Sequence, residues 1–467
     1  MKVDEIVFEL LGKEVESIPT KIESLKERQR PQPDVKTFEK QWNPNTHDVF
    51  DKALRPDKMI KKDVAGVETD AIEKVTRIAL ALQKLIVKRA ASFLFGREVV
   101  INTSTNDLNE QEQLAFDSLK KILSTNKEKS LNKEIARELF RCTEVAELWY
   151  PIESEKANRY GFESDLKIRN QIYSPLKGYS LFPLFDDTGD MIAFSIEYKM
   201  KEAGKDIKFF ETFTSDQRII WRQNGSEWVE VSNVENTIGK IPIVYGFQEE
   251  VEWADVQNLI DRLEKLLSNF GDTNDYHGSP KIFVEGELLG FSKKGDSGGI
   301  LQGDVGTKAS YLSWDHAPES VRLEIENQLR MIYSITQTPD ISFDSVKAIG
   351  AVSGVALKLM FMDAHLKVED KKEIFDEFLT RRYNIIKAYI GVMNNGLKKA
   401  ADSLDLEPEI TPYMIQDEQA LVEMLVSATG QKQILSRKSA IKILNWADDV
   451  DSELTDIDDE ELDSQPI

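Results

Sequence analysis

Apolar residues recur at helical spacing in two segments near the middle of the chain, and a glycine-rich segment separates them. The first segment, 252–270, has an apolar face made of Val256, Leu259, Ile260, Leu263, Leu266, Leu267 and Phe270. The second segment, 319–336, has a similar face made of Val321, Ile325, Leu329 and Ile332. The residues between them mix short apolar runs with glycines, which is typical of short strands and tight turns. The pattern predicts a pair of helices that carries a small β module.

The N-terminal part of the chain is predicted to contain an arm followed by helices. Residues 1–60 are charged and interrupted by proline, so we expect a short helix and then an extended arm that lies on a neighbouring molecule or stays mobile. A strong helix is predicted to begin at Ile72 and to stop at Gly96. It rests on the spacing of Ile72, Val75, Ala79, Leu82, Ile86, Ala90 and Phe93. Further helices are expected near 109–125 and 131–142.

The remainder of the chain changes character twice. Residues 145–248 alternate apolar and polar positions between the turn sequences DDTGD and QNGS, which predicts an antiparallel sheet with hairpins. After the central module, the loop TPDISFDSVKAIGAVSG leads into a long helix predicted over 353–395. The C-terminal end is predicted to be helical. It has no Lys or Arg between 448 and 463, which fits a disordered acidic tail and an exposed helix face equally. The fold class predicted is α+β, mostly helical.

Composition narrows the classes of function. The chain has 467 residues with a formal net charge of −22, so it is not expected to hold nucleic acid over its whole surface, which needs clustered bases. Cys142 is the only cysteine, which excludes an internal disulfide and a thiolate metal cluster and suits a reducing cytoplasm. No stretch approaches the roughly 20 apolar residues that a membrane helix needs, and the N-terminus is too acidic for a signal peptide.

One short motif suggests catalysis. The sequence GDSGG at 295–299 matches the nucleophile loop of chymotrypsin-like serine proteases, where the serine attacks and backbone N–H groups hold the oxyanion. That interpretation would make Ser297 the nucleophile of a hydrolase. It also needs a histidine base, and His277 lacks the sequence context of one. Small residues of this kind are common in tight turns, which is the interpretation we favour.

Other catalytic and cofactor motifs are missing from the sequence. The nearest match to a phosphate-binding loop, NTIGKIPI, has Ile241 where the hydroxyl that binds Mg²⁺ must be, so Lys240 is expected to be a loop lysine. The four histidines have no metal-ligand spacing and are expected to be surface or structural residues: His47, His277, His316 and His365. We therefore predict no catalytic residue, no cofactor and no metal.

Lysines stand out on this acidic chain in two places. The β module contains Lys281, Lys293, Lys294 and Lys308. They suit either the solubility of an exposed module or contact with DNA or an acidic partner. Lys347 and Lys358 flank the following loop, where a simple loop lysine and a DNA contact are both open. Trp253 and Trp314 lie near the starts of the two central helices, where packing anchors are expected.

Five segments of the chain carry a family resemblance: RPDKMI (55–60), RIALALQKLIVKRAASFLFGREV (77–99), IPIVYG (241–246), SGVALKLMFM (353–362) and ILSRKSAIKILNWADDVDSELTDIDDEE (434–461). In these segments and in the order of its elements, the chain resembles the portal, or head–tail connector, proteins of tailed bacteriophages. SGVAL alone is weak, but it follows a helix–β–helix unit and is joined by the C-terminal segment. The resemblance spans most of the chain, although the first 50 residues match little.

The resemblance implies a portal architecture. Its parts are an N-terminal arm (1–60), a wing of helices and antiparallel sheet (61–251), a first stem helix (252–272), a clip (273–316), a second stem helix (317–336), a tunnel loop (337–353), a long wing helix (354–398) and a crown with an acidic tail (399–467). The residues implied to face DNA in the tunnel are Ser342, Asp344, Lys347, Ser353 and Lys358. The residues implied to dock partners at the clip are Lys281, Lys293, Lys294 and Lys308.

The resemblance also implies a function and partners. A portal is a ring, typically dodecameric, at one vertex of the capsid, and it forms a channel for genome packaging and ejection. The implied partners are other copies of the chain, double-stranded DNA, the terminase, the head–tail adaptor, and the major capsid and scaffolding proteins; no membrane is involved. The resemblance also implies that the ring is assembled in the host cytoplasm and becomes part of the virion. The alternatives are the Ser297 hydrolase and a minor head or scaffold protein that is not a portal.

Overall fold

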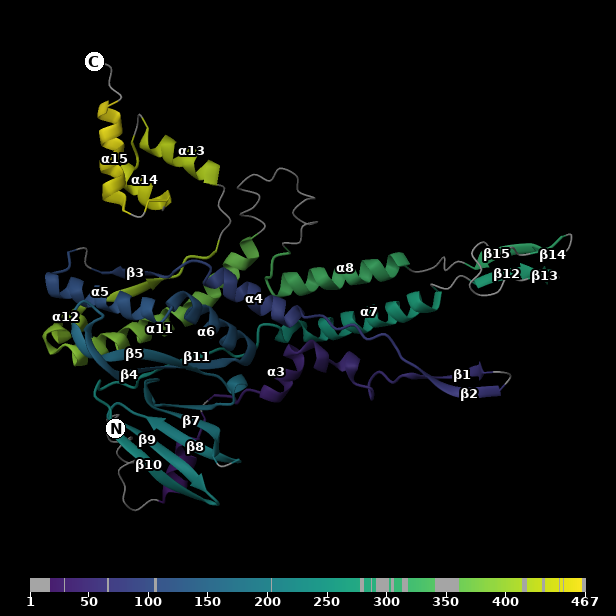
Figure 1. Cartoon of the computed structure of the whole chain (residues 1–467), viewed down its shortest axis with the longest axis horizontal. Coiled ribbons are helices and arrows are strands. Elements are labelled where there is room, and N and C mark those ends of the chain that lie inside the picture. The colour runs from purple at the N-terminus through teal and green to yellow at the C-terminus, as the bar shows by residue number, and fades with distance from the viewer. Residues whose placement is uncertain are drawn as a thin grey trace.

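The computed structural model describes most of the chain, and Figure 1 shows its arrangement. The described residues are 17–28, 30–64, 67–104, 107–202, 204–277, 281–286, 288–290, 302–303, 306–312, 318–340, 361–413, 418–430, 433–444, 446–447 and 449–463. Helices and sheets form a body, and a pair of helices projects from it with a small β module beyond their ends. The fold is mixed helix and sheet, as the sequence predicts.

Helices and a three-stranded sheet build the main core of the body. The helices are α4 (Leu82–Leu94), α5 (Glu110–Thr125), α6 (Glu128–Cys142), α11 (Met362–Met393) and α12 (Lys398–Ser403). The sheet has the order β11–β4–β5 and consists of β4 (Glu144–Asn158), β5 (Glu163–Tyr173) and β11 (Ile243–Phe247). Phe140, Trp149 and Phe375 are fully buried between these layers. A two-stranded sheet of β3 (Val100–Thr103) and β16 (Leu406–Glu409) ties the segment after α12 to the body.

A five-stranded antiparallel meander lies beside this core. Its strands are β6 (Ser180–Phe185), β7 (Met191–Glu202), β8 (Lys205–Phe213), β9 (Gln217–Asn224) and β10 (Glu227–Glu235). One group of its side chains, including Phe194 and Phe213, packs with residues of β4 and β11. The antiparallel hairpins predicted for residues 145–248 are confirmed. Alternation of apolar and polar positions explains them, because successive side chains of a strand point to opposite faces.

The N-terminal segment packs on its own chain. Helix α2 (Ile18–Leu25) buries Ile22 and Leu25 against the meander, beside Phe210 and Trp221. We expected a short helix and then an arm that lies on a neighbour or stays mobile. A short helix is present, but its two apolar residues pack on a hydrophobic surface of the same chain. Helix α3 (Val35–Trp42) and the short turns η1 (Pro44–Thr46) and η2 (Asp48–Phe50) then lead to the base of the projecting helices.

The two projecting helices and the β module match the prediction for the middle of the chain. A short turn η4 (Ala254–Val256) precedes α7 (Gln257–His277), and α8 (Pro318–Ile335) runs beside it. Ile260, Leu263 and Ile332 are fully buried, and Ile325 and Leu329 pack against the same core. The module contains β12 (Lys281–Glu285), β13 (Leu288–Gly290), β14 (Gln302–Gly303) and β15 (Lys308–Leu312). Strands β12 and β15 pair antiparallel, as do β13 and β14.

The helix predicted to begin at Ile72 is wrong in its first part. Strand β1 (Lys58–Val64) and strand β2 (Val67–Glu73) form an antiparallel hairpin, and α4 begins only at Leu82. Ile72 is exposed on the hairpin, whereas the Ile78 and Leu80 amides donate hydrogen bonds to side chains of α7. Tertiary hydrogen bonds thus hold residues 74–81 out of a helix, although their apolar positions fit helical spacing.

The C-terminal helices lie apart from the body in Figure 1. They are α13 (Glu418–Thr429), α14 (Arg437–Leu444) and α15 (Val450–Asp463). Of the two interpretations of the acidic end, the helix is the one found, and most of its described residues are exposed. The long helix predicted over 353–395 is observed as α11 in its described part. No described helix is long and apolar enough to span a membrane.

Candidate functional site

The helix pair α7–α8, its base and its tip form the candidate functional site. Apolar contacts hold the pair together on one side, and an ion pair holds it on the other. The Nη2 and Nε atoms of Arg262 on α7 donate to Oε1 of Glu324 on α8 at 2.7 Å and 3.0 Å. These two side chains are partly exposed, so this pair fixes alignment more than it adds stability. The apolar seam supplies most of the stabilisation.

A buried carboxylate fastens α7 to the segments that precede α4. Oε1 of Glu264 accepts a hydrogen bond from the Leu80 amide at 2.8 Å and lies 2.7 Å from Nδ1 of His47. The other ring nitrogen of His47 lies 2.7 Å from the Gln41 carbonyl oxygen. Burial opposes protonation of His47, but the hydrogen bond and the charge of Glu264 outweigh it and raise the pKa of the imidazole. His47 is therefore a structural residue.

A second buried carboxylate sits where α8 ends. Glu252 forms ion pairs of 2.5 Å with Lys367 and with Lys371, both on α11. Nζ of Lys367 also donates to the Thr336 carbonyl oxygen at 3.0 Å. Burial opposes ionisation of Glu252, but the two ammonium groups outweigh it and lower the pKa of the carboxyl. A cavity of 330 Å³ opens beside this cluster.

Helix α4 contacts the chain on both sides of residues 341–360. Nη1 of Arg89 donates to the Pro339 carbonyl oxygen at 2.6 Å, after the end of α8. The ring of Phe93 lies 5.5 Å from the ring of Phe361, just before α11. The described residues on either side of 341–360 are therefore both held by α4, and Pro339 belongs to the segment 337–353 that is implied to be the tunnel loop.

The residues predicted to face DNA lie outside the described residues. These are Ser342, Asp344, Lys347, Ser353 and Lys358. Among the residues predicted to dock partners, Lys293 and Lys294 also lie outside them, as do Ser297 and the rest of GDSGG. Lys281 begins β12, and Lys308 begins β15 with an exposed side chain. Trp253 is the packing anchor we expected: it is fully buried, and its Nε1 donates to Oε1 of Gln41 at 2.9 Å.

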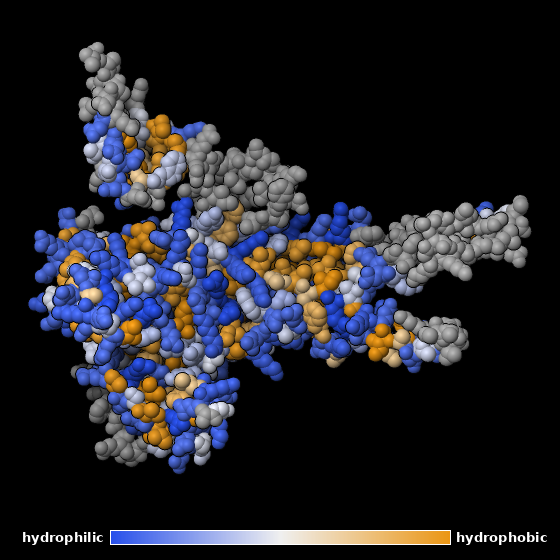
Figure 2. All heavy atoms as spheres, in the orientation of Figure 1, coloured by the Kyte–Doolittle hydropathy of each residue, from blue (hydrophilic) through white to orange (hydrophobic). Residues whose placement is uncertain are grey.

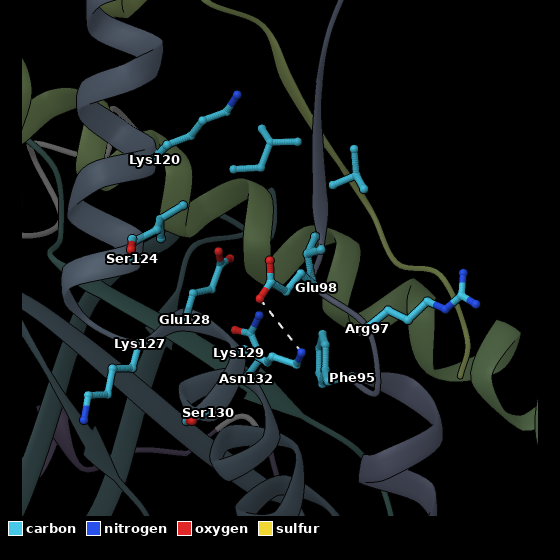
Figure 3. A pocket seen from close by; sticks show the side chains of 14 residues that line it. Phe95, Arg97, Glu98, Lys120, Ser124, Lys127, Glu128, Lys129, Ser130 and Asn132 are labelled. Carbon is cyan, nitrogen blue, oxygen red and sulfur yellow. Dashed lines mark ion pairs between the residues drawn. The ribbon is translucent and has the colours of Figure 1, made fainter. Parts of the chain in front are cut away.

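A groove in the body lies apart from the helix pair, and Figure 3 shows its lining. It has a volume of 520 Å³ and lies between α5, α6 and the residues that lead into β3. Lys129 forms an ion pair of 3.9 Å with Glu98 across it. Burial raises the pKa of Glu128, although Arg382 lies 3.6 Å away. Both of its acids thus lie near a basic group, which suits a surface groove better than an active site.

Sequence reasoning missed the buried ion pairs. Arg382 and Lys367 occupy positions between the buried apolar residues of α11, where a charged residue calls for a buried partner. Their spacing from Val368, Phe375 and Phe378 would have located them on the buried face. In the described part of the chain, no group of three or more His, Cys, Asp or Glu side chains could hold a metal ion.

Comparison with known protein families decides the identity. The family model described as "Phage portal protein, SPP1 Gp6-like" matches residues 23–466, nearly the whole chain. The chain belongs to this family of phage portal proteins. A portal protein is a structural component and not an enzyme, so the hydrolase interpretation of GDSGG is set aside. No curated protein matches this portal protein.

Two of the solved structures that are similar to the portal protein are particle necks. The structure titled "Neck of empty GTA particle computed with C6 symmetry" has 11% sequence identity and a TM-score of 0.42, and the match covers 78% of this chain and 89% of that one. "Neck of native GTA particle computed with C12 symmetry" has 10% identity and a TM-score of 0.39, with coverage of 78% and 88%.

Proposed function

We propose that this portal protein assembles into a closed ring, dodecameric as in its family, at one vertex of the capsid. The channel of the ring admits double-stranded DNA during packaging and releases it during ejection. The observation that carries the proposal is the family match over residues 23–466, together with a helix pair that projects from a folded body and bears a β module. A projecting pair of this kind suits a tube wall better than a pocket.

In this proposal each part of the chain has a place in the ring. Residues 252–272 and 317–336 form the stem and 273–316 the clip. Residues 337–353 line the tunnel. The wing consists of 61–251 and 354–398, the arm is 1–60, and 399–467 form the crown. The clip receives the terminase during packaging and the head–tail adaptor afterwards, while the wing meets the major capsid and scaffolding proteins.

The charge of the chain supports a conduit. Every copy contributes a formal net charge of −22, so a ring is strongly negative. A negative wall repels phosphate and lets DNA slide, whereas a basic wall would hold it. Lysines such as Lys347 and Lys358 then supply weak local contacts in the tunnel.

Imaging the purified full chain tests the proposal. We expect negative-stain electron micrographs to contain rings with a central channel wide enough for duplex DNA, and light scattering to give the mass of a closed oligomer. A chain that stays monomeric across a range of concentration and salt would overturn the proposal. An oligomer without a channel would also overturn it, since that result fits a minor head or scaffold protein.

A further inference from the structure

The hairpin β1–β2 and the strand pair β12–β15 project to the same side of the molecule, and open space separates them in the views of Figures 1 and 2. Each is a two-stranded antiparallel sheet without a third strand among the described residues. An isolated two-stranded sheet is marginally stable in water and usually needs a packing partner. Within one chain, neither sheet covers the other.

The base of the hairpin is fixed to the end of α7. Nη2 of Arg55 donates to Oδ2 of Asp272 at 2.6 Å, and the Thr76 amide donates to Oδ1 of the same carboxylate at 2.6 Å. Arg77 and Asp57 add an ion pair of 2.9 Å across the base of the hairpin. The hairpin is thus held in a set direction, which lowers the entropy lost when it binds a partner.

One face of the hairpin combines an exposed apolar pair with an exposed pair of opposite charges. Met59 lies opposite Ile72, and these side chains are 71% and 67% exposed. Two residues further along the same face, Lys61 lies opposite Asp70, and both are exposed. Residues opposite one another in an antiparallel pair share a face, so all four present one surface.

The strand pair β12–β15 has an exposed face of the same design. Phe283, which is 53% exposed, lies opposite Ser310, and Glu285 lies opposite Lys308. All four side chains are exposed. Each face therefore offers an apolar group beside charged side chains. Lys61 already forms an ion pair of 3.0 Å with Glu68 on its own hairpin, so the charge match between the two faces is that of Asp70 with Lys308.

We propose that the hairpin face of Met59, Ile72, Lys61 and Asp70 docks on the β12–β15 face of the next copy of the chain, with Phe283 against the apolar pair and Asp70 against Lys308. The inference rests on the proposed ring and names a contact that builds it. Two different surfaces on the same molecule make a head-to-tail contact, which closes into a ring by rotation. Lys308 was predicted to contact DNA or an acidic partner. In this proposal that partner is the neighbouring copy of the chain.

Crosslinking the full chain tests the contact directly. A chain with Ile72→Cys and Phe283→Cys is oxidised and run on a denaturing gel without reductant. We expect a ladder of linked multimers, because each disulfide joins neighbouring copies. The native Cys142 is fully buried and stays out of the reaction. A matched control combines Ile72→Cys with Met200→Cys, an exposed position on β7, and should give no ladder.

Charge exchange provides the second arm. We expect Asp70→Lys or Lys308→Asp alone to weaken association by roughly threefold per contact, since like charges then face each other, and the double exchange to restore it. Asp206→Lys, at an exposed position on β8, is the control and should leave the rings intact.

The outcomes separate the contact from the proposed function. If the unaltered chain forms rings, each single charge variant forms them equally well and the cysteine variant gives no ladder, the contact is overturned while the proposed function stands. A link confined to single chains would overturn it as well. If the unaltered chain forms no rings, the proposed function fails and the contact fails with it.

Discussion

At the scale of single residues, the body depends on a guanidinium group buried in its centre. Nε of Arg382 on α11 donates to Oε2 of Glu147 on β4 at 2.9 Å, and Nη1 donates to Oδ1 of Asn132 on α6 at 2.5 Å. Both members of the ion pair are fully buried. Burial raises the pKa of Glu147 against the pull of Arg382. Three elements of the core therefore meet at one charge.

Removing that charge is expected to be costly. Arg382→Ala should lower the free energy of unfolding by about 3–5 kcal/mol, because Glu147 is left buried without its partner. The adjacent Arg381 forms a partly exposed pair with Glu377 at 2.7 Å, and Arg381→Ala should cost less than about 0.5 kcal/mol. Urea unfolding measures both. Equal losses in the two variants would contradict the argument.

At the scale of elements, α7 approaches the segment before α4 more closely than a side chain allows. A Cβ added to Gly271 would lie 2.8 Å from Cγ2 of Thr76, which is closer than such atoms normally come. The same Thr76 donates from its Oγ1 to Oδ2 of Asp275 at 3.2 Å. The absence of a side chain at Gly271 thus lets the base of the hairpin sit against the projecting helix.

Alanine at position 271 is therefore expected to lower stability, although alanine is the better helix former. Alanine is better than glycine in a helix by about 1 kcal/mol, yet we expect Gly271→Ala to destabilise by about 1–3 kcal/mol through overpacking. Thr76→Ser removes the methyl group and keeps the hydroxyl. Combining Thr76→Ser with Gly271→Ala should therefore restore the stability that Gly271→Ala loses. Thermal unfolding and hydrogen exchange at the Thr76 amide measure the effect. A stabilised single variant would show that the segment moves aside freely.

Sequence patterns predicted elements better than they predicted contacts. The α7–α8 pair and the antiparallel sheet of 145–248 were correct because their apolar faces repeat regularly over many residues. The helix was predicted to begin too early because Ile72 and Val75 fit a helical period by chance. The Ile78 and Leu80 amides instead donate to Ser268 and Glu264, far along the chain, and this keeps the segment before α4 out of a helix. No local pattern contains that information. The predicted tunnel residues stay a prediction.

At the scale of the whole molecule, the chain divides at the segment after β16. Leu406 and Ile410 are buried in the main core, and the Tyr413 amide donates to the Phe93 carbonyl oxygen at 2.8 Å. Beyond this point α13, α14 and α15 lie apart from the body. A segment with few contacts across it marks a boundary between units that fold separately.

Two truncations test this division. A chain that ends at residue 413 should unfold at the same temperature as the body of the full chain, since its core is complete. A chain that ends at residue 405 loses β16 together with Leu406 and Ile410, and its unfolding temperature should fall by several degrees. Calorimetry compares them. If the unfolding temperature of the chain that ends at residue 413 falls by as much as that of the shorter chain, the C-terminal helices support the body.

The position of Arg89 and Phe93 on α4 has a mechanical consequence. They lie one turn apart on the helix, and each holds one end of the chain that flanks residues 341–360. A pull on either end therefore loads the same turn of the same helix. Because α4 packs with α6 and α11 in the main core, this turn passes part of that load into the body, beside the bond of Lys367 to the Thr336 carbonyl oxygen. We therefore expect a force on this segment to reach the core of the subunit partly through α4.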